Sequence, residues 1–140
     1  MKKVLIAGYF DPLHEGHLDH IVKASELGDY LVIVTHTDEC TERVKGRRFT
    51  TASFRRFILE SIIDKLGIRG EVIVTNKADV ADVIEQVSPD IFAKGRDRMP
   101  SNMPGSELQA CDNVGCKIIY GIGAVLNSSS RIKKVLLSEV

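Results

Sequence analysis

The sequence lacks a net charge, because its 19 lysines and arginines are balanced by 19 aspartates and glutamates. A protein that binds nucleic acid through its surface usually carries a basic excess. Aromatic residues make up only 6% of the chain, and none interleaves with its main basic cluster to stack on bases. No nucleic-acid partner is therefore expected.

Cysteine is scarce and long hydrophobic runs are missing. The three cysteines (Cys40, Cys111 and Cys116) do not form the paired framework of a secreted disulfide scaffold. The spacing of Cys111 and Cys116 has no matching second pair, so a zinc site is not expected. The apolar run at residues 4–7 is too short for a signal peptide or a membrane span. We expect free thiols, no membrane partner and a cytoplasmic location.

The chain does contain a regular alternation of strand-like and helical patterns. Its 140 residues, 44% of them apolar, suit one domain over residues 1–140. Strands are expected at residues 3–7, 30–34, 71–74, 90–93 and 117–120. Helices are expected at residues 16–27, 52–66, 80–87, 107–113 and 128–137, and loops at 35–50, 94–105 and 121–127. This alternation predicts an α/β fold, a Rossmann-like three-layer αβα sandwich with a five-stranded parallel sheet.

The most informative motif is Gly8-Tyr-Phe-Asp-Pro-Leu-His-Glu-Gly-His17, between the first strand and the first helix. His14 and His17 are spaced to project the same way from the first helical turn. A helix N-terminus attracts anions, and imidazoles donate hydrogen bonds to phosphate and gain charge beside it. A metal role is the weaker alternative, because no third ligand follows at a suitable spacing. The motif predicts a phosphate-chain site.

A basic segment follows the second strand, with four positive charges within residues 43–48 and Gly46 as a candidate hinge. Side chains of this kind can close over phosphates and neutralise charge in a transition state. Lys45 is the favoured candidate, and a solvated surface is the alternative. Arg55, at the start of the next helix, is a candidate to point back toward the site.

Two more segments follow strands and therefore reach the same edge of a parallel sheet. Three serines open the last helix, where one serves as N-cap and the row offers a second anion site. Asp97 follows the fourth strand and either binds the nucleoside or forms a loop salt bridge.

His20 is expected to be a packing or surface histidine. His36 either faces the site or has a local partner.

These segments together resemble a known family. The Gly8-to-His17 motif resembles the G-x-F-D-x-x-H-x-G-H signature of the cytidylyltransferase-like nucleotidyltransferases. Ser128-Ser-Ser-Arg-Ile132 resembles their second signature, and residues 45–62 look like their middle segment. Lys94-Gly-Arg-Asp97 looks like the K-G-G-D of adenylyltransferases that act on heptose 1-phosphate. The resemblance covers nearly the whole chain.

The resemblance implies a nucleotidyl transfer. An acceptor phosphate would attack the α-phosphorus of a nucleoside triphosphate in line, with Mg²⁺ accompanying the triphosphate and pyrophosphate leaving. Catalysis would rest on positioning and charge stabilisation. A homodimer is also implied, since relatives are commonly dimers. A non-catalytic nucleotide-binding module is the alternative, against which the presence of both signatures argues.

The resemblance also implies roles for single residues. The catalytic positions are His14, His17 and Lys45. The nucleotide-binding positions are Tyr9, Phe10, Asp11, Lys94, Asp97, Ser128, Ser129 and Ser130. The acceptor-binding positions are Asp38 and Arg55.

Two departures from the relatives bear on the substrates. Glycerol-phosphate cytidylyltransferases carry R-T-E-G-I where this chain has Tyr120-Gly-Ile-Gly-Ala124, and the missing arginine disfavours CTP. Arg96 replaces the second glycine of K-G-G-D. We expect ATP and a sugar 1-phosphate of the heptose type, as in lipopolysaccharide biosynthesis. CTP with glycerol 3-phosphate or another polyol phosphate is the alternative.

Overall fold

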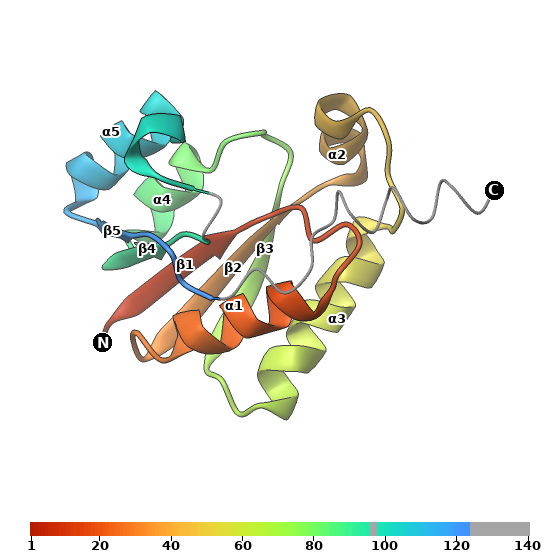
Figure 1. Ribbon diagram of the computed structural model, residues 1–140, viewed down its shortest axis with the longest axis horizontal. Helices are drawn as coiled ribbons and strands as arrows, with labels where there is room; N and C mark the ends of the chain where they lie inside the picture. Colours follow the sequence, from red (N-terminus) through yellow and green to blue (C-terminus); the bar gives the residue numbers. More distant parts are fainter. Residues whose placement is uncertain (96–97, 124–140) are drawn as a thin grey trace.

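Five parallel strands form the centre of the computed structural model, which describes residues 1–95 and 98–123 (Figure 1). The strands are β1 (Lys3–Ala7), β2 (Tyr30–His36), β3 (Gly70–Thr75), β4 (Ile91–Ala93) and β5 (Lys117–Ile119). The helices are α1 (Glu15–Ser25), α2 (Asp38–Lys45), α3 (Ala52–Lys65), α4 (Ala81–Val87) and α5 (Gly105–Val114), with a 3₁₀ turn at Pro100–Asn102. The predicted Rossmann-like α/β fold with a five-stranded parallel sheet is confirmed.

The strands contribute side chains to two hydrophobic cores, one on either face of the sheet. Successive side chains of a strand point to opposite faces, so Val4 and Ile6 of β1 join one core while Leu5 joins the other. Helices α1 and α3 cover the first face, and α4 and α5 cover the second (Figure 1). The near-continuous apolar runs that predicted these strands are explained by burial on both faces.

The strand order β3-β2-β1-β4-β5 reverses direction between β1 and β4. From β1 the chain builds outward through β2 to β3, then crosses to the other side of β1 to form β4. Crevices for ligands in such sheets lie beyond the carboxyl ends of the strands at this switch point. The segment at residues 8–14, which we call the signature loop, follows β1, and Lys94 follows β4. The fold therefore places both segments at one edge.

Helix α2 corrects the prediction that residues 35–50 form one polar loop. Thr37 caps this helix, since its Oγ1 accepts a hydrogen bond from Cys40 N at 3.1 Å. An ion pair between Glu39 and Arg43, one turn apart, supports its exposed face. Only Cys40 and Thr41 of α2 are buried, and the rest of this short helix is mostly charged, so few apolar residues mark it in the sequence. Capping rather than burial pattern marks this helix.

The other predicted elements agree with the structure to within a few residues at their ends. The 94–105 segment contains the 3₁₀ turn, and α5 begins two residues earlier than predicted. The predicted helix at residues 128–137 lies outside the described residues. Within the described part of the chain, no helix has the length and apolar character needed to cross a membrane.

Candidate functional site

His14 and His17 build the first turn of α1. His14 is the N-cap residue, and its Nδ1 accepts a hydrogen bond from Gly16 N at 3.1 Å. His17 completes a capping box, because its Nδ1 accepts from the backbone N of His14 at 3.3 Å. The two rings stack with centroids 3.7 Å apart. The predicted pairing of the histidines on one face of the helix start is what the structure shows.

These contacts determine where each imidazole carries its hydrogen. A nitrogen that accepts a hydrogen bond has no hydrogen of its own, so the neutral rings of His14 and His17 carry theirs on Nε2. Burial lowers the pKa of both rings, that of His17 to about 3, with the neighbouring His14 adding to the effect. Near neutral pH the pair therefore offers two neutral Nε2–H donors beside a helix N-terminus.

Phe10 packs against the histidine pair through its contact with His17. Its side chain is buried, and its ring meets that of His17 edge to face at 4.9 Å. A Cβ on Gly8 would lie 3.4 Å from this ring, an ordinary van der Waals distance, so the ring itself does not require glycine at this position. Phe10 itself has φ of 52°, a left-handed conformation that is uncommon for a bulky residue and often marks a functional site. The role that the structure shows for Phe10 is support of His17.

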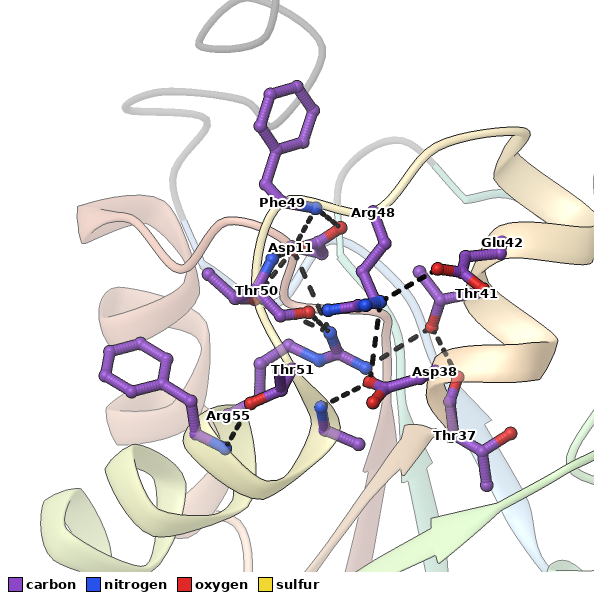
Figure 2. Close-up of polar contacts among 12 residues, drawn as sticks. Asp11, Thr37, Asp38, Thr41, Glu42, Arg48, Phe49, Thr50, Thr51 and Arg55 are labelled. Carbon is purple, nitrogen blue, oxygen red and sulfur yellow. Dashed lines mark hydrogen bonds and ion pairs between the residues drawn. The ribbon is translucent and has the colours of Figure 1, made fainter.

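Asp11 fastens the signature loop to the segment that precedes α3 (Figure 2). Its carboxylate is buried and accepts hydrogen bonds from Phe49 N at 2.9 Å and from Thr50 N at 2.8 Å. The Thr50 hydroxyl donates to the same carboxylate at 2.7 Å. The sequence prediction set Asp11 beside the nucleotide, whereas the structure shows its oxygens bound to the protein. Its partners were not foreseen, since nothing local in the sequence links residues 38 positions apart.

Arg55 is fully buried on α3 and faces the same cluster (Figure 2). It donates hydrogen bonds to Thr50 O at 2.5 Å and to His36 O at 2.7 Å, and lies 3.9 Å from the Asp11 carboxylate. Burial lowers the pKa of this guanidinium, and the Asp11 charge opposes that shift. The predicted contact of Arg55 with an acceptor stays a prediction, because its Nη1 and Nη2 donate to protein groups and its buried Nε has no partner among the described residues.

Asp38 holds the start of α3. Its carboxylate accepts a hydrogen bond from Ala52 N at 2.6 Å and lies 3.7 Å from Arg48 Nε, which also contacts Glu42 (Figure 2). Thr51 caps the same helix through a bond from Phe54 N. The proposed role of Asp38 toward an acceptor stays a prediction, and the contacts in the structure anchor the basic segment.

Lys45 and Gly46 end α2 beside the signature loop. Gly46 has φ of 74° and forms the left-handed C-cap of the helix, with its N–H bonded to Glu42 O at 2.8 Å. A helix cap explains this glycine, and its role as a hinge stays a prediction. The ammonium of Lys45 lies 4.8 Å from the centre of the Tyr9 ring. Lys45 therefore reaches the signature loop, as the sequence prediction requires.

The far side of the site is formed by Lys94 and the segment after β5. Lys94 is mostly buried, and its ammonium lies over the Phe92 ring at 4.5 Å. Its backbone O accepts a bond from Ile122 N at 2.9 Å, and Ile122 O lies 2.6 Å from His20 Nδ1 on α1. The prediction that His20 is a packing residue agrees with this contact. Ile122 thus ties the Lys94 segment to the helix that carries the histidine pair.

Some of the predicted site residues cannot be placed. Asp97 and the serines at positions 128, 129 and 130 lie outside the described residues. No cluster of three or more histidine, cysteine, aspartate or glutamate side chains suited to a metal ion occurs within residues 1–95 and 98–123. The described site therefore consists of the signature loop, the start of α1, the end of α2 and the ends of β4 and β5.

Comparison with known proteins adds to this geometry. A family model described as cytidylyltransferase-like matches residues 5–121. The chain is similar to an FAD synthase of Aciduliprofundum boonei, with 35% identity over 100 residues that cover 70% of this chain and 63% of that protein. It is similar to the bifunctional protein HldE of Helicobacter pylori, with 36% identity over 109 residues, 76% of this chain and 23% of that protein. It thus spans less than two thirds of these relatives.

Solved structures share the fold. A lipopolysaccharide core biosynthesis protein from Thermoplasma volcanium superimposes with a TM-score of 0.68 at 27% identity, covering 89% of this chain and 98% of that one. A protein of unknown function from Archaeoglobus fulgidus, at 19% identity and a TM-score of 0.66 over 91% and 94% of the two chains, shows likeness of fold alone.

Replacing Asp11 with asparagine is expected to destabilise the protein by about 3 kcal/mol, because it leaves the buried Arg55 cation without its counter-charge. The matched control is Glu60→Gln, which breaks an exposed ion pair with Arg56 and should cost less than about 1 kcal/mol. Urea unfolding of the two variants measures both values. Equal small losses would show that the buried pair does not hold the site together.

The stability of the protein is expected to fall below pH 6.5 because of His36. Burial lowers its pKa from 6.5 to about 4, so between these values the unfolded chain binds a proton that the folded chain excludes. The contribution of neutral His36 to the free energy of unfolding is complete above pH 6.5. It falls as the pH falls, by roughly 1–2 kcal/mol between pH 7 and pH 5. His36→Asn should remove this part of the dependence in urea unfolding at the two pH values, while the part due to His17, whose pKa is also lowered by burial, remains. An unchanged dependence in the variant would contradict the assignment.

Proposed function

The chain belongs to the cytidylyltransferase-like family of nucleotidyltransferases, and we propose that it transfers a nucleoside monophosphate from a nucleoside triphosphate to a phosphorylated acceptor. The observation that carries this proposal is the stacked pair of His14 and His17 at the N-terminus of α1, beside the switch point of the sheet. Two Nε2–H donors and a helix N-terminus suit the anionic oxygens of a phosphate chain.

In the proposed reaction an oxygen of the acceptor phosphate forms a bond to the α-phosphorus of the triphosphate. The bond from that phosphorus to the oxygen bridging to the β-phosphate breaks, and pyrophosphate leaves. The attacking phosphate is already an anion, so no side chain has to remove a proton. His14 and His17 donate hydrogen bonds to phosphate oxygens, and Lys45 adds a positive charge. Fixed donors and charges of this kind stabilise the charge that develops in the transition state.

Mg²⁺ is proposed to enter with the triphosphate. The carboxylates of Asp11 and Asp38 accept hydrogen bonds from backbone N–H groups, so they suit a structural role better than metal ligation. Mg²⁺ in phosphoryl transfer is commonly held by substrate phosphates and water with few protein ligands. In that arrangement it would supply charge neutralisation, while the residues of the chain position the phosphates. The homodimer and the cytoplasmic location stay predictions from the sequence.

For substrates, we propose ATP as donor and a sugar 1-phosphate of the heptose type as acceptor. The similarity to HldE, which has a heptose 1-phosphate adenylyltransferase domain, supports this choice. The likeness to a lipopolysaccharide core biosynthesis protein agrees with it. The similarity to an FAD synthase favours flavin mononucleotide as a second acceptor, again with an adenylyl group transferred. CTP with glycerol 3-phosphate or another polyol phosphate is the alternative that the sequence left open.

A pyrophosphate-release screen tests this function. ATP, CTP, GTP and UTP are each combined with heptose 1-phosphate, other sugar 1-phosphates, glycerol 3-phosphate, polyol phosphates and flavin mononucleotide, with Mg²⁺ present. We expect the fastest release with ATP and a sugar 1-phosphate. Release with flavin mononucleotide or with CTP would reassign the substrates within the same reaction class. Binding of nucleotide with no release for any pair would favour a non-catalytic binding module.

His17→Ala is expected to lower turnover by a factor of about 100 or more, as the loss of one transition-state donor does. The same change also removes the capping-box acceptor for His14 N. His17→Gln separates the two effects, because a glutamine at this position can keep the cap. Glu15→Ala, an exposed change in the same helical turn, should leave turnover unchanged. Near-normal turnover in a folded His17→Ala protein would refute the role assigned to this histidine.

A further inference from the structure

The Tyr9 side chain lies next to the last residue of α2. The Lys45 ammonium sits 4.8 Å from the centre of the Tyr9 ring, within the distance of about 6 Å over which an aromatic face attracts a cation. Tyr9 belongs to the signature loop and Lys45 to the basic segment, so this contact joins two segments that are 36 positions apart. It brings the cation to the same loop that ends at the histidine pair.

Tyr9 is itself held in place by three contacts. Its backbone O accepts a hydrogen bond from the Thr35 hydroxyl at 3.2 Å, and its ring stacks on His36 with centroids 4.0 Å apart and planes 19° apart. Its hydroxyl interacts with the thiol of Cys40 on α2. Burial first, and then Cys40, raises the pKa of Tyr9 to about 12, so the phenol is neutral. The ring therefore offers Lys45 a fixed and uncharged surface.

The His36 ring stacks on the Tyr9 ring and adds no positive charge. Its ring is only 2% exposed, and its Nδ1 donates a hydrogen bond to Lys77 O at 2.9 Å. Burial, with smaller contributions from Arg55 and Lys45, keeps the pKa of His36 at about 4, so the ring is neutral near pH 7. A charged imidazole stacked on Tyr9 would repel the Lys45 ammonium. The neutral pair of rings therefore adds no charge that would repel the Lys45 ammonium.

We propose that Tyr9 is a positioning residue for Lys45, holding its ammonium at the signature loop before the nucleotide binds. The proposal rests on the proposed function, in which Lys45 contacts the phosphates. A lysine has a long, flexible side chain, and ordering it in advance removes part of the entropy cost of binding. The aromatic ring thus holds the charge at the signature loop, ready for the phosphate chain.

The contact can be tested in the protein alone, by NMR of the Lys45 side chain. Protons held over an aromatic face are shifted upfield, so the CεH₂ signal of Lys45 should be shifted in the unmodified chain and in Tyr9→Phe. It should move to the ordinary position in Tyr9→Leu. Tyr30→Leu is the matched control, because it makes the same substitution at the first residue of β2, whereas Tyr9 stacks on His36 at the last. It should leave the Lys45 signal shifted. An unshifted signal in the unmodified chain overturns the proposal.

A double-mutant cycle tests the consequence for activity, with the best donor and acceptor from the pyrophosphate-release screen. Tyr9→Leu should lower kcat/KM about tenfold, a value within the range of a partly desolvated cation–aromatic contact, and Tyr9→Phe should stay within about twofold of the unmodified enzyme. In a Lys45→Ala background, Tyr9→Leu should have no further effect.

Additive effects of the two changes would mean that Tyr9 acts without Lys45, and they would overturn the proposal. So would a Tyr9→Phe enzyme as impaired as Tyr9→Leu, because the ring alone should suffice. An unmodified enzyme that is inactive with every pair of substrates would refute the proposed function instead. The two failures are thus distinguishable, since the NMR signal of Lys45 is read without any substrate.

Discussion

The arrangement of the site depends on one buried cation, the guanidinium of Arg55. A charge removed from water is tolerated only when it is paired and hydrogen-bonded, so the surrounding segments have to supply acceptors. Asp11 comes from the signature loop, His36 O from the end of β2, and Thr50 O from the segment before α3. Thr50 is bound on both sides, by Arg55 at its O and by Asp11 at its N and hydroxyl. The requirements of this charge set how the segments around the site lie relative to one another.

Two stacked pairs of neutral aromatic rings form the part of the site beside the signature loop. His14 and His17 stack as one pair and Tyr9 and His36 as another, and burial holds all three histidines in the uncharged state near pH 7. Stacked neutral rings repel neither one another nor a nearby cation. The positive charge beside the signature loop therefore comes from the Lys45 ammonium and the partial charge of the α1 N-terminus rather than from the histidines. Such fixed donors need little rearrangement when charge develops on a phosphate.

The strands and their parallel direction followed from the sequence, because strands buried on both faces are continuous apolar runs and helical patterns separate them. The order of the strands in the sheet did not, since it depends on tertiary pairing. The pairing of His14 and His17 followed from their spacing on a helix. Helix α2 was missed because it is short and mostly charged, and capping by Thr37 and a left-handed Gly46 define it rather than a run of apolar residues. The partners of Asp11 and Arg55 were missed for another reason: they depend on tertiary contacts, and the sequence shows only that the residue types suit a phosphate site.

The capping geometry also bears on the kind of acceptor that the site can use. A hydroxyl nucleophile needs a base with a lone pair to accept its proton. At the start of α1 the Nδ1 lone pairs of His14 and His17 already accept backbone hydrogen bonds, and their Nε2 atoms carry hydrogens. The nearby Asp11 carboxylate accepts three donors from Phe49 and Thr50. These groups are suited to donate to anions or to hold the chain in place. An acceptor phosphate is already deprotonated, so it needs no base from them. The same hydrogen bonds that start the helix therefore favour phosphorylated acceptors over alcohols.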